Sequence, residues 1–225
     1  MDMELFLYNS PAFQTFLKNN PHERGEVKFL ESIAKEGMNV IDVGGHIGIT
    51  AVAIAKKVWK RGWVYSFEPI PEYFDILKKN LSANKLENAE VFQLAVSDRV
   101  GRIDFYQKGG SSGIIVEKGA KKFKANTTTI DRFLNDQKIE RIDLINMDCE
   151  GSELLVLKGA KESLQKNKVK IFCEIHHNSL RHLGQSVQRV VQYLQKLGYE
   201  VHSVSLDDLS MRSDFGNAEY IYARN

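Results

Sequence analysis

Several features that would mark a special class of protein are missing from this chain of 225 residues. No apolar run approaches the roughly 20 residues that span a bilayer, and the opening Met-Asp-Met-Glu lacks the basic flank of a signal peptide. Only two cysteines occur, Cys149 and Cys173, and both fall within predicted buried strands. We therefore expect a cytoplasmic protein with reduced core cysteines and no membrane partner.

An excess of one charge is also missing, because 31 lysines and arginines are balanced by 29 acidic residues. This balance gives no reason to expect a nucleic-acid partner. Hydrophobic residues make up 43% of the chain and charged residues 27%, which is ordinary for a globular protein with a sizeable core. The length suits a single sheet with flanking helices.

Short apolar runs alternate with segments of helical periodicity, which predicts an α/β fold with a mostly parallel sheet covered by helices on both faces. Residues 1–37 are predicted to form a helical cover on the domain made by residues 38–225. Helices are also expected at residues 130–136 and 187–197. The expected strands are residues 40–43, 64–67, 90–94, 142–148, 168–175, 199–205 and 218–223.

The segment between the third and fourth of these strands is less regular. Residues 102–106 alternate between polar and apolar side chains, so we expect an added edge strand there. Residues 108–124 are rich in glycine, serine and lysine. This stretch could be a mobile loop over a pocket or a solvated surface loop, and both interpretations stay open.

A turn rich in glycine follows the first predicted strand, which ends near Asp42. The residues of this turn that we assign to a ligand site are Gly44, Gly45, His46 and Gly48. Because glycine has no Cβ, the turn can tighten and the backbone can approach a ligand closely. The second strand ends at Glu68 and Pro69, and an acid in this place can accept hydrogen bonds from both ribose hydroxyls. The layout is typical of a nucleotide-cofactor pocket.

The spacing of the glycines distinguishes two kinds of cofactor. A dinucleotide site requires Gly-x-Gly-x-x-Gly, and no register of residues 44–48 satisfies this pattern. Asp42 would sit badly beside a pyrophosphate but well beside the ammonium and sulfonium of S-adenosylmethionine. S-adenosylmethionine is therefore the expected cofactor, and an NAD-dependent oxidoreductase is the weaker alternative. A purely structural explanation stays open, in which Asp42 caps the turn and Glu68 is solvated.

Acidic and histidine side chains lie at or just after the ends of the fourth and fifth predicted strands. Asp148 ends the fourth strand and Glu150 and Glu153 come just after it, while Glu174 lies near the end of the fifth strand and His176 directly follows that strand. In open α/β sheets, ligands bind outside the carboxyl ends of the strands. We therefore expect these side chains near the reactive end of the cofactor. Acids here could also serve only to stabilise the dipole of the next helix.

Two chemical roles are open for this group. Asp148 with Glu174 or His176 could hold a divalent metal that lowers the pKa of an acceptor hydroxyl. The sequence contains no complete ligand spacing, so a metal is not part of the predicted site. His176 or His177 could instead be a general base, or one of them an ordinary surface histidine.

Four motifs, in the same order along the chain, resemble those of a known family. They are Asp42-Val-Gly-Gly-His-Ile-Gly48, Phe67-Glu-Pro-Ile-Pro71, Ala95-Val-Ser97 and Asp148-Cys-Glu-Gly-Ser-Glu153. Over about residues 38–178 the sequence resembles the FkbM family of S-adenosylmethionine-dependent methyltransferases, and the last motif is the most specific to it. Two positions depart from the family pattern: His46 stands where asparagine is usual, and Asn146 where lysine is common.

The resemblance implies a class I methyltransferase fold, which is Rossmann-like, with a mostly parallel seven-stranded sheet and an antiparallel C-terminal strand. It also implies O-methylation of a hydroxyl on a sugar, polyketide or similar small-molecule or glycan acceptor. By the same resemblance, Asp42 and Gly44 would hold the methionine part of the cofactor and Glu68 the ribose. Val96 and Ser97 would contact the adenine edge.

In the expected reaction an acceptor oxygen attacks the methyl group in line, so the protein would contribute mainly proximity and alignment. An alcohol is a poor nucleophile at neutral pH and needs help from a base. We assign catalytic roles to Asp148, Glu150 and His176, and we expect Asp148 to lie beside the cofactor as well. A catalytically silent cofactor-binding scaffold is the main alternative function.

Overall fold

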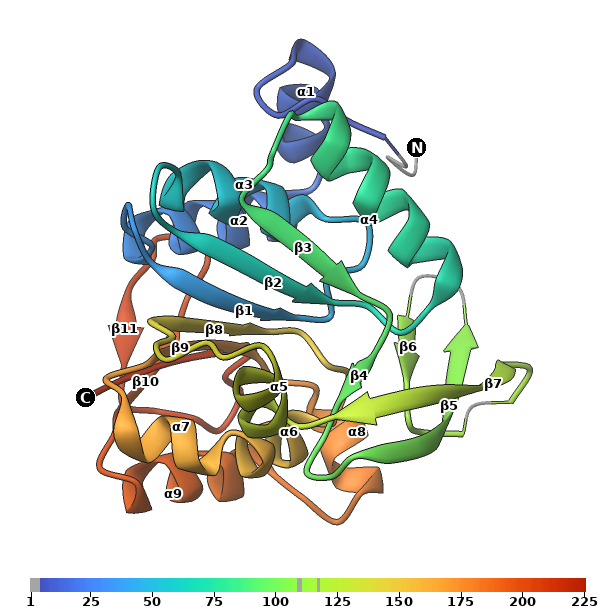
Figure 1. Cartoon of the computed structure of the whole chain (residues 1–225). Coiled ribbons are helices and arrows are strands. Elements are labelled where there is room, and N and C mark those ends of the chain that lie inside the picture. Colours follow the sequence, from blue (N-terminus) through green and yellow to red (C-terminus); the bar gives the residue numbers. More distant parts are fainter. Residues whose placement is uncertain (1–4, 109–110, 117) are drawn as a thin grey trace.

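The computed structural model describes residues 5–108, 111–116 and 118–225, and its centre is one large sheet (Figure 1). The sheet has eight strands in the order β11-β10-β12-β9-β8-β1-β2-β3. Their bounds are β1 (Asn39–Val43), β2 (Trp63–Phe67), β3 (Ala89–Phe92), β8 (Leu144–Met147), β9 (Lys170–Glu174), β10 (Glu200–Val204), β11 (Met211–Arg212) and β12 (Tyr220–Arg224).

The pairing of the strands confirms the predicted class of fold. β1 pairs in parallel with β2 on one side and with β8 on the other, so the strand order reverses at β1. β12 is antiparallel to both of its neighbours, β9 and β10. Seven strands therefore follow the expected arrangement, and β11 adds a strand of two residues at the edge.

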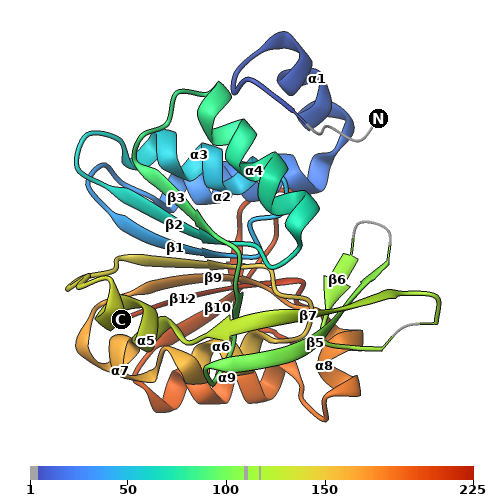
Figure 2. The ribbon, with the colours of Figure 1, turned by 45° about the vertical axis from the view of Figure 1, so that its right-hand side comes forward.

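Helices cover both faces of the sheet (Figure 2). One face is covered by α2 (Pro21–Ile33), α3 (Ile49–Val58) and α4 (Pro71–Ala83), with α1 (Pro11–Asn19) packed beside α2. The other face is covered by α5 (Ile130–Asp136), α6 (Glu153–Gly159), α7 (Lys161–Lys166) and α9 (Val187–Lys196), while α8 (His177–His182) follows β9. Among the described residues, no helix is long and apolar enough to cross a membrane.

Alternate side chains of β1 enter the two apolar layers. Val40 belongs to the same buried apolar cluster as Phe29 of α2, and Ile41 belongs to the cluster that contains Val190 of α9 in the opposite layer. Because both faces are covered, every residue from Val40 to Val43 is buried, including an acid. This double burial explains why the strand shows no polar and apolar alternation in the sequence.

A second, smaller sheet lies beside the carboxyl ends of the large one. It contains β4 (Ala95–Val96), β5 (Gly101–Lys108), β6 (Ser111–Gly113) and β7 (Lys121–Thr128), in the order β4-β7-β5-β6. Residues 102–106 are thus a strand, but they pair with β7 and β6 and add no edge to the large sheet. The loop expected at 108–124 contains β6 and the start of β7, while residues 109, 110 and 117 lie outside the described residues.

Candidate functional site

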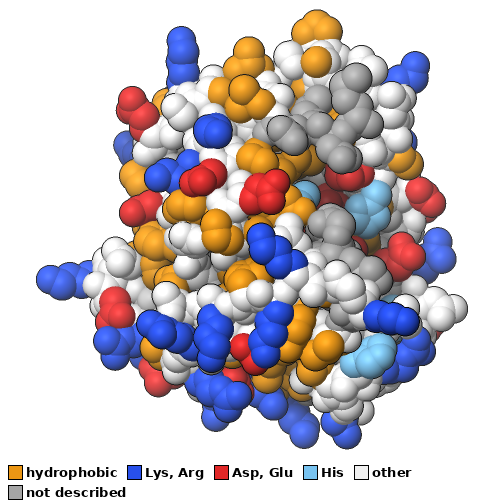
Figure 3. Space-filling view, turned by 90° about the vertical axis from the view of Figure 1, so that its right-hand side faces the viewer, with side chains coloured by type: hydrophobic (Ala, Val, Ile, Leu, Met, Phe, Trp, Pro, Cys, Tyr) orange, Lys and Arg blue, Asp and Glu red, His pale blue; other side chains and the backbone are white. Residues whose placement is uncertain are grey.

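An open cleft of about 680 Å³ lies at the carboxyl ends of the central strands, next to the second sheet. This volume includes space that is open to solvent. Figure 3 shows acidic and histidine side chains gathered around the hollow on this face. The lining residues are Val43, Gly44, His46, Phe67, Glu68, Pro69, Leu94, Ala95, Val96, Ile103, Phe105, Asp148, Cys149, Glu150 and Ser152.

Gly44 lets the turn after β1 come into direct contact with the turn after β8. Its φ is +88°, and an added Cβ would lie 1.8 Å from the carbonyl oxygen of Asp148. No larger residue fits such an approach, and the left-handed conformation itself favours glycine. Gly45 and Gly48 do not line the cleft: their missing Cβ atoms make room for Ser66 and Leu77 respectively.

Asp42 lies beneath this turn and is fully buried. Its Oδ2 accepts a hydrogen bond from Ser66 Oγ at 2.6 Å, and its Oδ1 accepts one from Asn146 Nδ2 at 2.8 Å. Burial raises the pKa of Asp42, although these hydrogen bonds act in the opposite direction. Asp42 supports the turn and does not line the cleft, so its contact with the methionine part of a cofactor stays a prediction.

Glu68 faces the cleft from the end of β2 and is only 3% exposed. Its Oε2 accepts a hydrogen bond from the backbone N–H of His46 at 2.9 Å, and its Oε1 accepts one from the N–H of Ile70 at 2.8 Å. Burial raises the pKa of Glu68 to about 7. The two backbone donors fix the carboxylate in place, so that it is preorganised to receive donors from a ligand.

His46 lies beside Glu68, in the turn that follows β1. Its ring packs edge-on against Tyr73 at 4.1 Å between centroids, and its φ is +45°. The Nε2 atom is buried without a hydrogen-bond partner in the described part of the chain, and burial lowers the pKa of the ring. A neutral ring with an unused polar atom at the cleft is suited to contact a ligand.

The apolar part of the cleft comes from several segments. Pro69 and Val96 line the cleft, but Ser97 does not. Ile103 and Phe105 of β5 also line the cleft, although they were not among the residues predicted for the site. Their alternation with polar residues was visible, but the pairing that brings β5 to the cleft was not.

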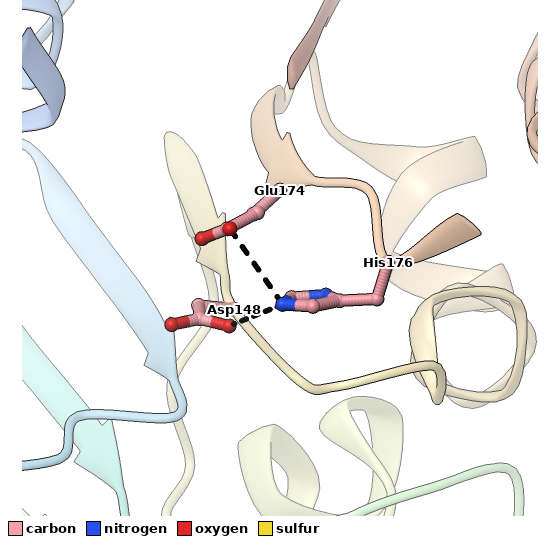
Figure 4. Close-up of side chains that lie close together, drawn as sticks. All are labelled: Asp148, Glu174 and His176. Carbon is pink, nitrogen blue, oxygen red and sulfur yellow. Dashed lines mark ion pairs between the residues drawn. The ribbon is translucent and has the colours of Figure 1, made fainter. Parts of the chain in front are cut away.

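His176 is the centre of a charged cluster at the ends of β8 and β9, as Figure 4 shows for three of its members. Its Nε2 lies 3.4 Å from Asp148 Oδ1, 3.5 Å from Glu150 Oε2 and 3.6 Å from Glu174 Oε1. The three predicted catalytic residues, Asp148, Glu150 and His176, are therefore together. Their assigned roles stay predictions.

Glu153 holds the other nitrogen of this ring. It is the first residue of α6 and is completely buried, and its Oε1 lies 3.0 Å from His176 Nδ1. Burial alone would lower the pKa of His176, but the hydrogen bond to Glu153 and the nearby carboxylates raise it to about 9. His177 lies apart, because its Nε2 contacts the carbonyl of Ala218 at 2.8 Å.

Residues far away in the sequence extend the cluster. His22 Nε2 of α2 lies 3.6 Å from Glu174 Oε1, and the hydroxyl of Tyr220 in β12 contacts His22. The same hydroxyl donates to Glu26 Oε1 at 3.3 Å. Burial raises the pKa of Glu26 to about 7, and repulsion from Glu174 adds to this effect. Only the folded structure joins these residues, so sequence reasoning missed them.

The two cysteines are free. Cys173 is buried in β9 as expected, but the prediction for Cys149 was wrong, because β8 ends at Met147 and Cys149 lies in the following turn. The shorter strand also places Asp148 just outside the sheet, where it can reach the cleft.

The strand order, the reversal at β1 and the cleft beside it define a Rossmann-like domain of the class I methyltransferase type. The solved structure of methyltransferase FkbM from Methylobacillus flagellatus KT has the same fold, with a TM-score of 0.55 and 18% identity over 84% of this chain and 43% of that one. The family described as Methyltransferase FkbM domain matches residues 42–201, and the chain belongs to this family.

Two curated relatives carry more specific names. The 2-O-methyltransferase NoeI of Sinorhizobium fredii is 28% identical over 148 residues, which cover 57% of this chain and 60% of that protein. The hexuronic acid methyltransferase AglP of Haloferax volcanii is 28% identical over 158 residues, which cover 68% of this chain and 62% of that protein. The chain thus spans about three fifths of the length of these relatives.

Proposed function

We propose that this protein is an S-adenosylmethionine-dependent O-methyltransferase. The observation that carries the proposal is that one cleft is lined both by the buried carboxylate of Glu68 and by Asp148 and Glu150 of the charged cluster. The first kind of group suits the ribose of a methyl donor, and the second suits an acceptor hydroxyl. Membership of the FkbM family supports a function in methyl transfer.

The cleft fits the methyl donor in three ways. Glu68 can accept hydrogen bonds from the ribose hydroxyls, and the apolar side chains of Val96, Ile103 and Phe105 suit the faces of an adenine ring. Gly44 lines the cleft, so its backbone is available to the methionine part of the donor. When bound, the donor supplies a methyl group already activated by its sulfonium.

The charged cluster suits the other partner of the reaction. Asp148 and Glu150 line the cleft, and His176 lies within 3.4–3.5 Å of both. These residues can orient an acceptor hydroxyl and receive its proton as the oxygen attacks the methyl group. The name of the 2-O-methyltransferase NoeI favours transfer to an oxygen, and the name of the hexuronic acid methyltransferase AglP favours a uronic acid as the acceptor. We propose a small-molecule or glycan acceptor in a cytoplasmic setting.

A radiolabelled methyl-transfer screen against sugars, uronic acids, polyketides and peptides tests the proposal. We expect labelled product with a hydroxylated acceptor, and at least about a tenfold loss of turnover on Asp148→Asn, while S-adenosylhomocysteine affinity is largely kept. The exposed acid Glu162, substituted as Glu162→Gln, is the matched control. Binding of S-adenosylhomocysteine without transfer to any acceptor class would favour the scaffold alternative, and binding of NAD alone would favour an oxidoreductase.

A further inference from the structure

We propose that Asp148, Glu174 and His176 form a binding site for one divalent cation at the edge of the cleft. One ligand atom from each of the three side chains lies within 4.8 Å of the other two (Figure 4). Atoms that share an ion at about 2.0–2.6 Å lie at most about 5 Å apart, so small side-chain movements would complete the site. The ligands come from the ends of two adjacent parallel strands, β8 and β9.

In metal-ligating histidines the second ring nitrogen usually contacts a carboxylate, and His176 has this arrangement. Glu153 Oε1 lies 3.0 Å from His176 Nδ1, which leaves Nε2 facing Asp148 and Glu174. A buried carboxylate on the far nitrogen fixes the orientation of the ring and strengthens it as a ligand. Glu153 is 0% exposed, and its Oε2 has no hydrogen-bond partner within the described part of the chain. A cation on Nε2 of the same ring would place further positive charge near this buried acid.

The balance of charge in the cluster also favours a cation. The carboxylates of Asp148, Glu150 and Glu174 surround one nitrogen of His176, and Glu153 contacts the other. His22 also contacts Glu174 and Glu26, so the two imidazoles of the cluster can carry at most two positive charges against five carboxylates. In addition, Asp148 Oδ1 is buried and without a hydrogen-bond partner among the residues that the structure describes. A divalent cation would satisfy this oxygen and offset the repulsion.

Two carboxylates and one imidazole are a ligand set for Mn²⁺ and similar divalent ions, with coordination positions left open. Because Asp148 also lines the cleft, those positions face the place of the acceptor. If the proposed function holds, the acceptor is a molecule with two neighbouring oxygens, such as a vicinal diol or a hydroxy acid, that both bind the ion.

The step would then proceed with the ion holding the acceptor oxygen and lowering the pKa of its hydroxyl. The O–H bond breaks and its proton passes to the Glu150 carboxylate. The oxygen lone pair forms the new O–CH₃ bond while the CH₃–S bond breaks, and the sulfur keeps that electron pair in S-adenosylhomocysteine.

Titration of the full chain with Mn²⁺, followed by the loss of the free-ion electron paramagnetic resonance signal, tests the site. We expect one bound ion per chain, and at least about a tenfold weaker affinity in Asp148→Asn and Glu174→Gln. Glu153→Gln touches no ion directly and should weaken binding by about 10- to 100-fold. The exposed Glu162→Gln should bind as the unchanged protein does. Circular dichroism identifies any variant that fails to fold.

Two results would overturn the site: no Mn²⁺ bound to the unchanged protein, or equal affinity in the folded Asp148→Asn and Glu174→Gln variants. Calorimetry with S-adenosylhomocysteine on the same samples separates this proposal from the proposed function. Mn²⁺ binding without S-adenosylhomocysteine binding keeps the metal site and contradicts the methyltransferase. The opposite pattern keeps the methyltransferase and removes the metal site.

Discussion

At the scale of single residues, Glu68 and Gly44 show how a buried site is prepared for a ligand. Glu68 is fixed by two backbone N–H groups at 2.8 and 2.9 Å, and Gly44 provides the space in which two turns meet. Neither role involves a flexible surface side chain. Each can be tested by a substitution that changes few atoms.

Cofactor affinity should depend on pH through Glu68. Burial raises the pKa of this group to about 7, so the carboxylate is mostly protonated at pH 6 and mostly ionised at pH 8. Ribose hydroxyls donate best to the ionised form, so affinity for S-adenosylhomocysteine should rise with pH, by about tenfold from pH 6 to its plateau. Calorimetry at several pH values measures this rise. Glu68→Gln should bind more weakly and lose the pH dependence; an unchanged profile in that variant would contradict the assignment.

Gly44→Ala should disrupt the site and destabilise the fold. The new Cβ would lie 1.8 Å from the carbonyl oxygen of Asp148, so one of the two turns has to move. We expect the free energy of unfolding to fall by more than about 2 kcal/mol in denaturant titrations, with loss of S-adenosylhomocysteine binding. Gly184→Ala is the control, because Gly184 has a similar positive φ of +65° but nothing within 4 Å of the added atom. That variant should lose only about 1–2 kcal/mol and keep its affinity.

At the scale of elements, α2 contributes to the core and to the site although it precedes the residues that match the family, 42–201. Phe29 packs 4.6 Å from Phe172 of β9 between ring centroids, and His22 and Glu26 lie in the charged cluster. One side of α2 therefore anchors the helix, and its N-terminal half reaches the carboxyl end of β9.

Phe29→Ala should reduce stability strongly. The ring is 1% exposed and fills space between α2, β9 and β12. Its removal leaves a cavity, and we expect the free energy of unfolding to fall by about 3–5 kcal/mol. Phe74→Ala on α4 is the comparison, since that ring is only partly buried and should have a smaller effect. Thermal and urea unfolding measure the loss of stability in both variants. Equal, small losses would show that α2 is not part of the cooperative fold.

At the scale of the whole molecule, the sequence predicted the large sheet well because its signals are local. The continuous buried run Val40–Val43 and the helical periodicity of α9 are each visible within a few residues, and the reversal at β1 follows from general topology. The second sheet was not predicted as a unit, since the pairing of β5 with β7 and β6 depends on contacts between distant segments. β4 pairs with β7 across 32 residues, as Ala95 with Thr127.

The residues of the site also fall into a group that the sequence predicts and a group that it does not. Glu68, His46 and the group Asp148, Glu150 and His176 could be predicted, because strand ends meet at one edge of a parallel sheet. The residues that hold these side chains in place could not be predicted. Glu153 looked like an ordinary acid at the start of a helix, and only the structure shows its contact with His176.

The contact of Gly44 with Asp148 has a mechanical consequence. Not even a methyl group fits between the two turns, one of which carries the proposed donor contacts and the other the proposed acceptor residues. Neither turn can therefore move closer to the other, and their backbone contact sets the shortest distance between the two halves of the proposed reaction site.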